Sequence, residues 1–233
     1  MLIIILIFFL FTGSIVVYNP HSESLKNATR MPFIERLNVN KGTLILGTIL
    51  IIIYLLTMNE DSYSTSDKMI HLFGLNSEII EHFFVFQLIT SIFLHFDLVH
   101  LCSNVLCLAL LSSYERRVGI RKFFIIFLIS AFVASLVDLI FLSEGTVSMG
   151  ASAGICGLVS GYFIDYPRTS WKEWGLGLIF VLAIIWVDSH LPESESKELN
   201  YKIDWLAHLV GAISGGILLL ILHERKKNNV HIT

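Results

Sequence analysis

The stretch Gly150-Ala151-Ser152-Ala153-Gly154 opens a glycine-rich apolar run that continues to about Ile164. At about 1.5 Å rise per residue, a helix over 150–165 is only about 22–24 Å long. The hydrocarbon core of a bilayer is about 30 Å thick. A helix this short begins below the membrane surface, so we expect Ser152 to lie inside the bilayer but near one face.

The composition is that of a membrane protein. Of the 233 residues, 55% are hydrophobic and 15% are charged, whereas a soluble domain has roughly 25% charged residues. We therefore predict an all-α, polytopic bundle.

The net charge of -3 and the scatter of basic residues over short loops argue against a nucleic-acid partner. Cys102, Cys107 and Cys156 all fall in apolar runs, which favours packing roles over disulfides.

Six other apolar runs accompany the run at 150–165. They lie near residues 1–18, 43–58, 98–113, 122–142, 174–188 and 205–222. We count 150–165 as a seventh span, because its neighbours need it to alternate sides. The segment 1–18 lacks the basic start and small-residue cleavage site of a signal peptide, so we interpret it as a retained helix. The predicted organisation is an additional helix at 1–18, a cytoplasmic linker at 19–42, a six-helix core at 43–222 and a cytoplasmic tail at 223–233.

Lysine and arginine predict the orientation, because cytoplasmic loops carry an excess of them. Thirteen of the sixteen basic residues fall in 19–42, 114–122, 166–173 and 223–233. The C-terminus is therefore expected inside and the N-terminus outside. Short loops and the lack of a targeting segment favour a bacterial plasma membrane. Ser152 and His208 then both begin helices that enter from the outside, at similar depth.

That shared depth suggests a catalytic pair. A serine hydroxyl is a weak nucleophile until a neighbouring base accepts its proton, and neutral imidazole does this near pH 7. Taken alone, Ser152 is more simply a packing residue. Asp204, one turn before His208, is a candidate to orient the ring, although a helix N-cap or a solvated loop charge is the simpler explanation.

An acyl-transfer site also needs donors for an oxyanion. His100 and Asn104 are four residues apart and share a helix face at the outer end of their span. With the backbone N–H of Ser152 they are candidate oxyanion donors, and a structural interhelical hydrogen bond is the alternative. His95 falls in the preceding loop and is expected to be structural. Asp138, in the outer half of its span, has no role beyond lining a cavity.

Glycines indicate close helix packing. Gly150, Gly154, Gly157 and Gly161 are expected to stripe the short helix. Gly211 and Gly215 follow His208 on its own helix and form a small-residue face. Backbones that approach this closely would bring Ser152 within reach of His208.

These residues together resemble the rhomboid family of intramembrane serine proteases. The matching pieces, in order over 43–222, are Leu88-Ile89-Thr90-Ser91-Ile92-Phe93-Leu94-His95, His100 with Asn104, Glu115-Arg116-Arg117-Val118-Gly119, Gly150-Ala151-Ser152, and Asp204, Ala207, His208, Gly211 and Gly215. Two departures stand out. Ala153 follows the serine where the family often has glycine, and Phe86-Gln87 replaces a frequent Trp-Arg.

The resemblance implies roles. Ser152 would be the nucleophile and His208 the general base of a dyad, with His100, Asn104 and the Ser152 N–H as the oxyanion hole. The loop 59–97 would be the family's membrane-dipping loop, with its apolar run Phe83-Phe84-Val85-Phe86 in the outer interface or dipping into the bundle. The loop 189–203 would cap the site, and Glu115 and Arg117 would form a structural pair.

We therefore predict an endopeptidase that cleaves in or near transmembrane segments of membrane-protein partners in the lipid bilayer. No cofactor or metal is implied, because no span carries His-Glu-x-x-His, and the sequence does not indicate an oligomeric state. One alternative is a catalytically inactive rhomboid-like protein that binds and recruits membrane proteins. A transporter would place its polar groups near mid-bilayer, and a soluble hydrolase elbow needs a strand-to-helix turn that the pattern lacks.

Overall fold

The computed structural model describes residues 33–59, 63–76, 85–141, 146–164 and 205–230. The expected spans 1–18 and 174–188, the loop 189–203 and Asp204 lie outside the described residues, as does the side chain of Arg117. Within the described parts the protein is a bundle of apolar helices, which confirms the predicted fold class.

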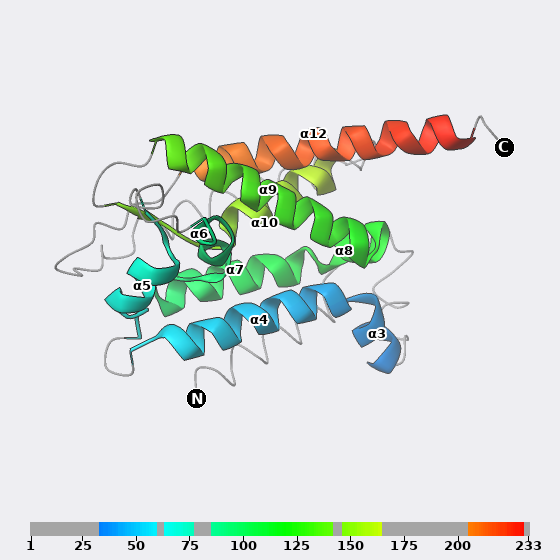
Figure 1. Ribbon diagram of the computed structural model, residues 1–233. Coiled ribbons are helices and arrows are strands. Elements are labelled where there is room, and N and C mark those ends of the chain that lie inside the picture. The colour runs from blue at the N-terminus through cyan, green and yellow to red at the C-terminus, as the bar shows by residue number, and fades with distance from the viewer. Residues whose placement is uncertain (1–32, 60–62, 77–84, 142–145, 165–204, 231–233) are drawn as a thin grey trace.

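The main helices run along a common direction (Figure 1). They are α4 (Lys41–Thr57), α7 (Leu98–Leu110), α9 (Ile120–Phe141), α10 (Ser152–Ile164) and α12 (Trp205–Val230). Leu98–Arg116, Ile120–Phe141 and Trp205–Leu222 are long and apolar enough to cross a membrane, by length and composition. The apolar helices α4 and α10 are shorter.

Helix α12 continues beyond the predicted end of its span at residue 222 and reaches Val230. Hydropathy shows where an apolar run ends, but a helix ends where its backbone hydrogen bonds from residue i to residue i−4 end. The last part of α12 is therefore a polar extension of the apolar span.

Helices α7 and α8 (Ser112–Val118) follow each other with only Leu111 between them. Gly119, with φ +81°, separates α8 from α9, and that left-handed conformation favours glycine. Here the buried carboxylate of Glu115 accepts hydrogen bonds from Gly42 N, Thr43 N and Thr43 Oγ1, each 2.7 Å long. It therefore fastens the start of α4 to α8, close to the short helix α3 (Phe33–Val39).

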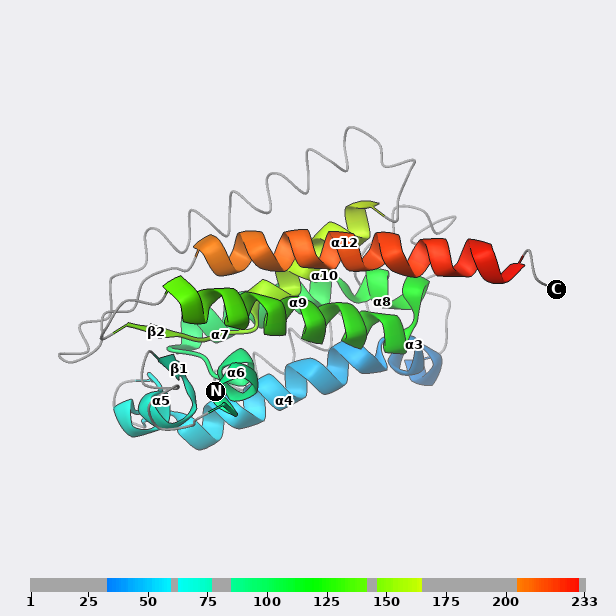
Figure 2. The ribbon, with the colours of Figure 1, turned by 45° about the horizontal axis from the view of Figure 1, so that its top comes forward.

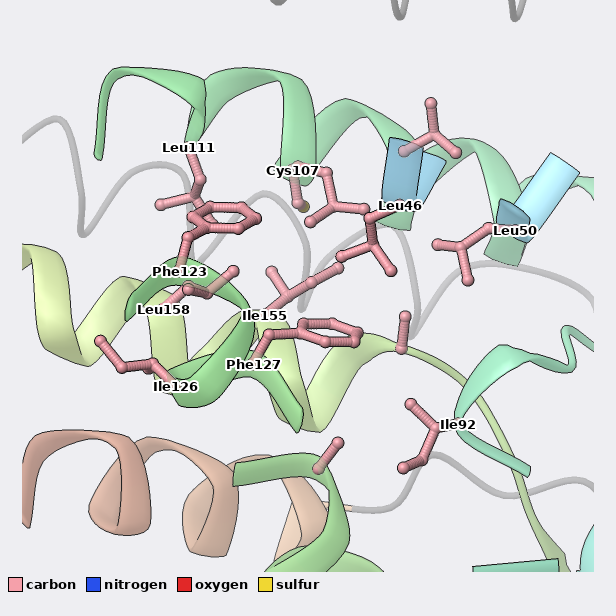
Figure 3. Packing of buried hydrophobic residues seen from close by; sticks show 14 of the residues in the cluster. Leu46, Leu50, Ile92, Cys107, Leu111, Phe123, Ile126, Phe127, Ile155 and Leu158 are labelled. Carbon is pink, nitrogen blue, oxygen red and sulfur yellow. The ribbon is translucent and has the colours of Figure 1, made fainter. Parts of the chain in front are cut away.

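The core lies between α4, α7, α9 and α10 (Figure 3). Phe123 and Phe127 of α9 are fully buried, and they share one cluster with Leu46 of α4 and Ile155 of α10. Lipid tails are as apolar as leucine, so van der Waals packing and close backbone approach, rather than escape from water, hold such helices together. Helix α10 packs against both α9 and α12, which also contact each other.

The first loop folds onto the end of the bundle where α12 begins (Figure 2). It contains α5 (Asp67–Phe73), β1 (Leu75–Asn76), α6 (Gln87–Thr90) and the 3₁₀ turn η2 (Ser91–Phe93). Side chains of the loop cover the open carbonyl end of α5, because Gln87 Nε2 donates to His71 O at 3.0 Å and Thr90 Oγ1 donates to Phe73 O at 2.8 Å. Gln87, where the family often has arginine, thus joins α6 to α5.

The apolar run of this loop is described only in part. Val85 and Phe86 are 60% and 46% exposed on the surface of the bundle, whereas Phe83 and Phe84 lie outside the described residues. The described half therefore does not dip into the bundle.

The first loop also pairs with the segment that precedes α10. Strand β1 is antiparallel to β2 (Val147–Ser148), with Leu75 opposite Ser148 and Asn76 opposite Val147. This pairing joins parts of the chain about seventy residues apart and fixes how the chain approaches Ser152.

Candidate active site

Ser152 is the first residue of α10, at the end of the bundle that carries the first loop. The chain reaches it through Gly150, whose N–H donates to Ser91 O at 2.9 Å, and through the fully buried Ala151. Our expectation that Gly150 belongs to the glycine stripe of the helix was wrong, because α10 begins two residues later. Gly150 instead has φ +125°, a conformation that side-chain-bearing residues rarely adopt.

The structure brings Ser152 and His208 together. His208, in the first turn of α12, has its Nε2 atom 2.7 Å from Ser152 Oγ. The indole of Trp205 lies edge-on to the imidazole of His208, with ring centroids 6.1 Å apart. If Nδ1 carries the ring proton, Nε2 accepts the hydroxyl hydrogen, which is the arrangement that activates a serine.

Glycines make this contact geometrically accessible. A Cβ atom on Gly211 would lie 2.2 Å from Ala153 O, and one on Gly215 would lie 2.5 Å from the Cα of Gly157. The backbones of α10 and α12 therefore touch directly, as the small-residue pattern predicts. Gly154 similarly lies against Phe127 of α9.

His100 lies beside the serine, in the first turn of α7. Asp97 caps that helix, because its carboxylate accepts the N–H of His100 at 2.7 Å. A Cβ atom built on Gly150 would be 2.8 Å from His100 Nε2 and 3.8 Å from Ser152 Oγ. The imidazole edge and the hydroxyl thus flank the same glycine, and any side chain at position 150 would occupy the space between them.

Asn104 is on the same helix, one turn further from the surface, and is 4% exposed. Its Nδ2 atom donates to His100 O at 3.0 Å. The amide is therefore engaged within its own helix, and its role as an oxyanion donor stays a prediction.

His95 lies in the turn before α7 and is fully buried, in line with a structural role. Its ring contacts that of His100, with centroids 5.0 Å apart, and its Nδ1 lies 3.2 Å from Phe93 O. Burial, reinforced by the neighbouring His100, lowers the pKa of His95 well below 6.5. The ring of His95 is therefore neutral at pH 7, and it packs against the ring of His100.

Three supporting residues were not predicted from the sequence. Asp97 caps α7, Trp205 packs on His208, and Ser148 bonds to Asp138. An aspartate directly before an apolar helical run is a common N-cap, so Asp97 was within reach of sequence reasoning. The other two depend on tertiary contacts. Among the described residues, no group of three or more His, Cys, Asp or Glu side chains is arranged to hold a metal ion.

The arrangement is suited to nucleophilic catalysis. A serine begins a helix, where backbone N–H groups lack intrahelical acceptors, an imidazole nitrogen lies within hydrogen-bond reach of its hydroxyl, and a second imidazole lies nearby. Ser152, His208 and His100 lie in the first turns of α10, α12 and α7, respectively.

Comparison with known proteins agrees with this geometry. A sequence model of the Rhomboid domain matches residues 82–225. RHOMBOID-like protein 7 of Arabidopsis thaliana is 29% identical over 157 residues, which cover 64% of this chain and 48% of that protein. Rhomboid-like protease 3 of Toxoplasma gondii is 27% identical over 114 residues, covering 48% of this chain and 43% of the relative.

A third relative is named as inactive. Inactive rhomboid protein 2 of Homo sapiens is 28% identical over 151 residues, covering 62% of this chain and 16% of the human protein. The chain spans less than half the length of each of these curated relatives.

Proposed function

The chain belongs to the rhomboid family, and we propose that it is an intramembrane serine endopeptidase that uses Ser152 as nucleophile and His208 as general base. The observation that supports this most directly is the 2.7 Å contact between Ser152 Oγ and His208 Nε2. A hydroxyl and an imidazole that are partly buried among apolar helices are costly unless they serve each other or a substrate. Ser152 and His208 are 56 positions apart in the sequence and lie on different helices.

In the proposed reaction, Ser152 Oγ attacks the carbonyl carbon of the scissile peptide bond while His208 Nε2 takes the hydroxyl proton. The tetrahedral intermediate collapses to an acyl-enzyme, and His208 returns the proton to the departing amine. A water molecule, deprotonated by His208, then attacks the ester and releases the new carboxylate. This sequence needs an imidazole that is neutral at the start and calls for no metal or cofactor.

Three donors are proposed for the oxyanion. The N–H of Ser152 is at a helix start, where it lacks an intrahelical acceptor. The side chain of His100 flanks Gly150 beside the serine. Asn104 Nδ2 carries two hydrogens; one donates to His100 O, and the second can donate to the oxyanion. Removing one such donor typically costs a factor of about 10²–10³ in kcat.

The substrates we propose are membrane proteins, cleaved in or near their transmembrane segments. The protein is an integral membrane protein of the family, so substrates can approach laterally through lipid. A helical substrate hides its carbonyl groups in its own hydrogen bonds and must unwind locally at the site. We further propose that the site opens to the outside face, as the distribution of basic residues predicts, so that water reaches Ser152 from there.

The membrane itself is not fixed by these comparisons. The three relatives named above come from a plant, an apicomplexan parasite and a human. They give no support to the bacterial plasma membrane, which stays a prediction from the short loops and the lack of a targeting segment.

The alternative function is a catalytically inactive rhomboid that binds membrane proteins and recruits them. It is favoured by the 28% identity to Inactive rhomboid protein 2. Against it stands the hydrogen-bonded Ser152–His208 pair, since a binding protein has no need of an aligned nucleophile and base.

The test is cleavage of a panel of model transmembrane substrates by the purified protein in liposomes. Wild type is expected to cleave at least one substrate and to react with a fluorophosphonate, whereas Ser152→Ala and His208→Ala lose both activities. Ser160→Ala, on the same helix, and His71→Ala, on the exposed face of α5, are matched controls that should retain them. Cleavage by Ser152→Ala at the wild-type rate would exclude the dyad. Binding without cleavage or labelling by the wild type would favour the inactive alternative.

A further inference from the structure

Asp138 is a buried carboxylate that the proposed dyad does not use. It is 4% exposed and lies in the last turn of α9, three residues before the helix ends at Phe141. That position is doubly unfavourable for a negative charge, since burial among apolar helices is costly and the C-terminal end of a helix is itself negative. Such a group is retained where a specific contact compensates for it.

The hydrogen bond of Asp138 joins it to the segment that directly precedes Ser152. Ser148 Oγ donates to Asp138 Oδ2 at 2.8 Å. Ser148 is the last residue of β2, four residues before Ser152, and only Met149, Gly150 and Ala151 lie between them. A hydrogen bond to an ionised acceptor is shorter and stronger than a neutral one.

Val147 and Ala151 are buried at the two ends of the segment 147–151. Ser148 pairs with Leu75 in a ladder of two residues, and so short a ladder is marginal by itself. Gly150 N donates to Ser91 O at 2.9 Å, and Ala151 O accepts a backbone hydrogen bond from Ile155 N at 3.0 Å. The bond from Ser148 to Asp138 therefore anchors this segment to the long helix α9, which packs directly on α10 and α12.

We propose that Asp138 is a positioning residue for the nucleophile: it holds Ser148, and through Ser148 it sets the 147–151 segment so that Ser152 Oγ meets His208 and His100. This inference deepens the proposed function and rests on it. In this proposal Asp138 acts through the side chain of Ser148, to which it is hydrogen-bonded. Its effect therefore falls on the alignment of Ser152 rather than on substrate affinity.

The experiment compares four variants in liposomes. Asp138→Ala removes the acceptor and Ser148→Ala removes the donor, whereas Asp138→Asn keeps an oxygen that can accept the same hydrogen bond. Ser135→Ala is the matched control, because its buried hydroxyl is one turn earlier on α9 and donates only to Ala131 O of its own helix. The readouts are kcat and KM for a cleaved model substrate, and amide hydrogen exchange over 146–152.

In Asp138→Ala and in Ser148→Ala, kcat is expected to fall about ten-fold or more with KM changed less than two-fold. The double variant should be no worse than either single one, because both remove the same contact. Asp138→Asn should retain at least half of the wild-type kcat. Exchange of the Gly150 amide should quicken about ten-fold in the two alanine variants and stay unchanged in Ser135→Ala.

Several results would overturn the proposal. These are full kcat in Asp138→Ala, additive losses in the double variant, equal losses in Asp138→Asn and Asp138→Ala, or unchanged exchange at Gly150. Failure of the proposed function looks different, because a wild type that neither cleaves nor reacts with fluorophosphonate contradicts catalysis itself. The exchange measurement still tests the anchoring of Ser152 in that case, since it needs no substrate.

Discussion

Replacing Gly211 with alanine should separate the two proposed catalytic residues without touching either. A Cβ atom at position 211 would lie 2.2 Å from Ala153 O, whereas ordinary van der Waals contact begins at 3.4 Å. The obstacle is backbone, which no rotamer change can move. Restoring contact therefore requires α12 to move away from α10 by about 1.2 Å, because packed interiors hold almost no free space.

The displacement acts directly on the dyad, because His208 is three residues before Gly211, about 4.5 Å along the same helix axis. The Ser152–His208 contact is 2.7 Å in the native protein, and a shift of about 1 Å takes it beyond hydrogen-bond reach. A misplacement of that size costs about 100-fold in rate, or about 2.7 kcal/mol of transition-state stabilisation. Overpacking adds a loss of about 1–3 kcal/mol in stability.

The assay is the rate of fluorophosphonate labelling at Ser152 together with kcat/KM for a cleaved substrate, measured at a temperature where the variant is folded by thermal melting. Gly216→Ala is the matched control on the same helix. Its Cβ would meet only the side-chain tips of Ile164 and Ser160, at 2.8 and 3.0 Å, which can move aside. We expect Gly211→Ala to lose about 100-fold and Gly216→Ala less than about three-fold. A folded Gly211→Ala protein that labels at the wild-type rate would refute this account of how α10 and α12 hold the dyad.

Three further outcomes are expected. Glu115→Ala leaves the first amides of α4 without their buried acceptor, so thermal melting should show a loss of about 3 kcal/mol, while alanine at the exposed Glu35 should change stability by less than about 0.5 kcal/mol. His95 takes up a proton near pH 6.5 in the unfolded chain but not in the folded protein, because its pKa is lowered by folding. The free energy of unfolding should therefore fall as pH drops below about 6.5, by up to about 1.4 kcal/mol per pH unit. Melting curves at pH 7.5 and 5.5 should differ less in a folded His95→Leu variant than in the wild type. Gln87→Leu removes the donor at the carbonyl end of α5, so amide exchange in α5 should quicken roughly five-fold, and unchanged exchange there would show that this bond is dispensable.

Much of the architecture follows from hydropathy. The predicted spans 43–58 and 122–142 correspond to Lys41–Thr57 and Ile120–Phe141, and the short run 150–165 corresponds to Ser152–Ile164. Residues that face lipid or a neighbouring helix must be apolar along the whole span, so the pattern is unambiguous. Hydropathy says nothing about where a helix stops after the apolar run, which is why the extension of α12 to Val230 was not predicted.

The contact between Ser152 and His208 could be predicted from the sequence, because it depends on the depth of each residue in the membrane. Ser152 and His208 both begin helices at the same end of the bundle, and small residues allow those helices to touch. The link from Asp138 to Ser148 was not predictable, because it depends on the path of the loop after α9. The pairing of β1 with β2 was equally hidden, since two-residue strands are too short to show an alternating pattern. Gly150 was wrongly assigned to the helix because its position continues the spacing of Gly154, Gly157 and Gly161, although its backbone, with φ +125°, is not helical.

Biosynthesis runs from the N-terminus, so α4 leaves the ribosome well before α8. The carboxylate of Glu115 is 73 and 72 positions beyond the amides of Gly42 and Thr43 that it binds. Until that residue is made, these amides can bond only to water or lipid headgroups. Docking of α4 to this carboxylate therefore follows synthesis of α7 and α8: the nascent chain completes this corner of the bundle only after Glu115 has been made. A translation product that ends before Glu115 would carry α4 without the acceptor for its first amides.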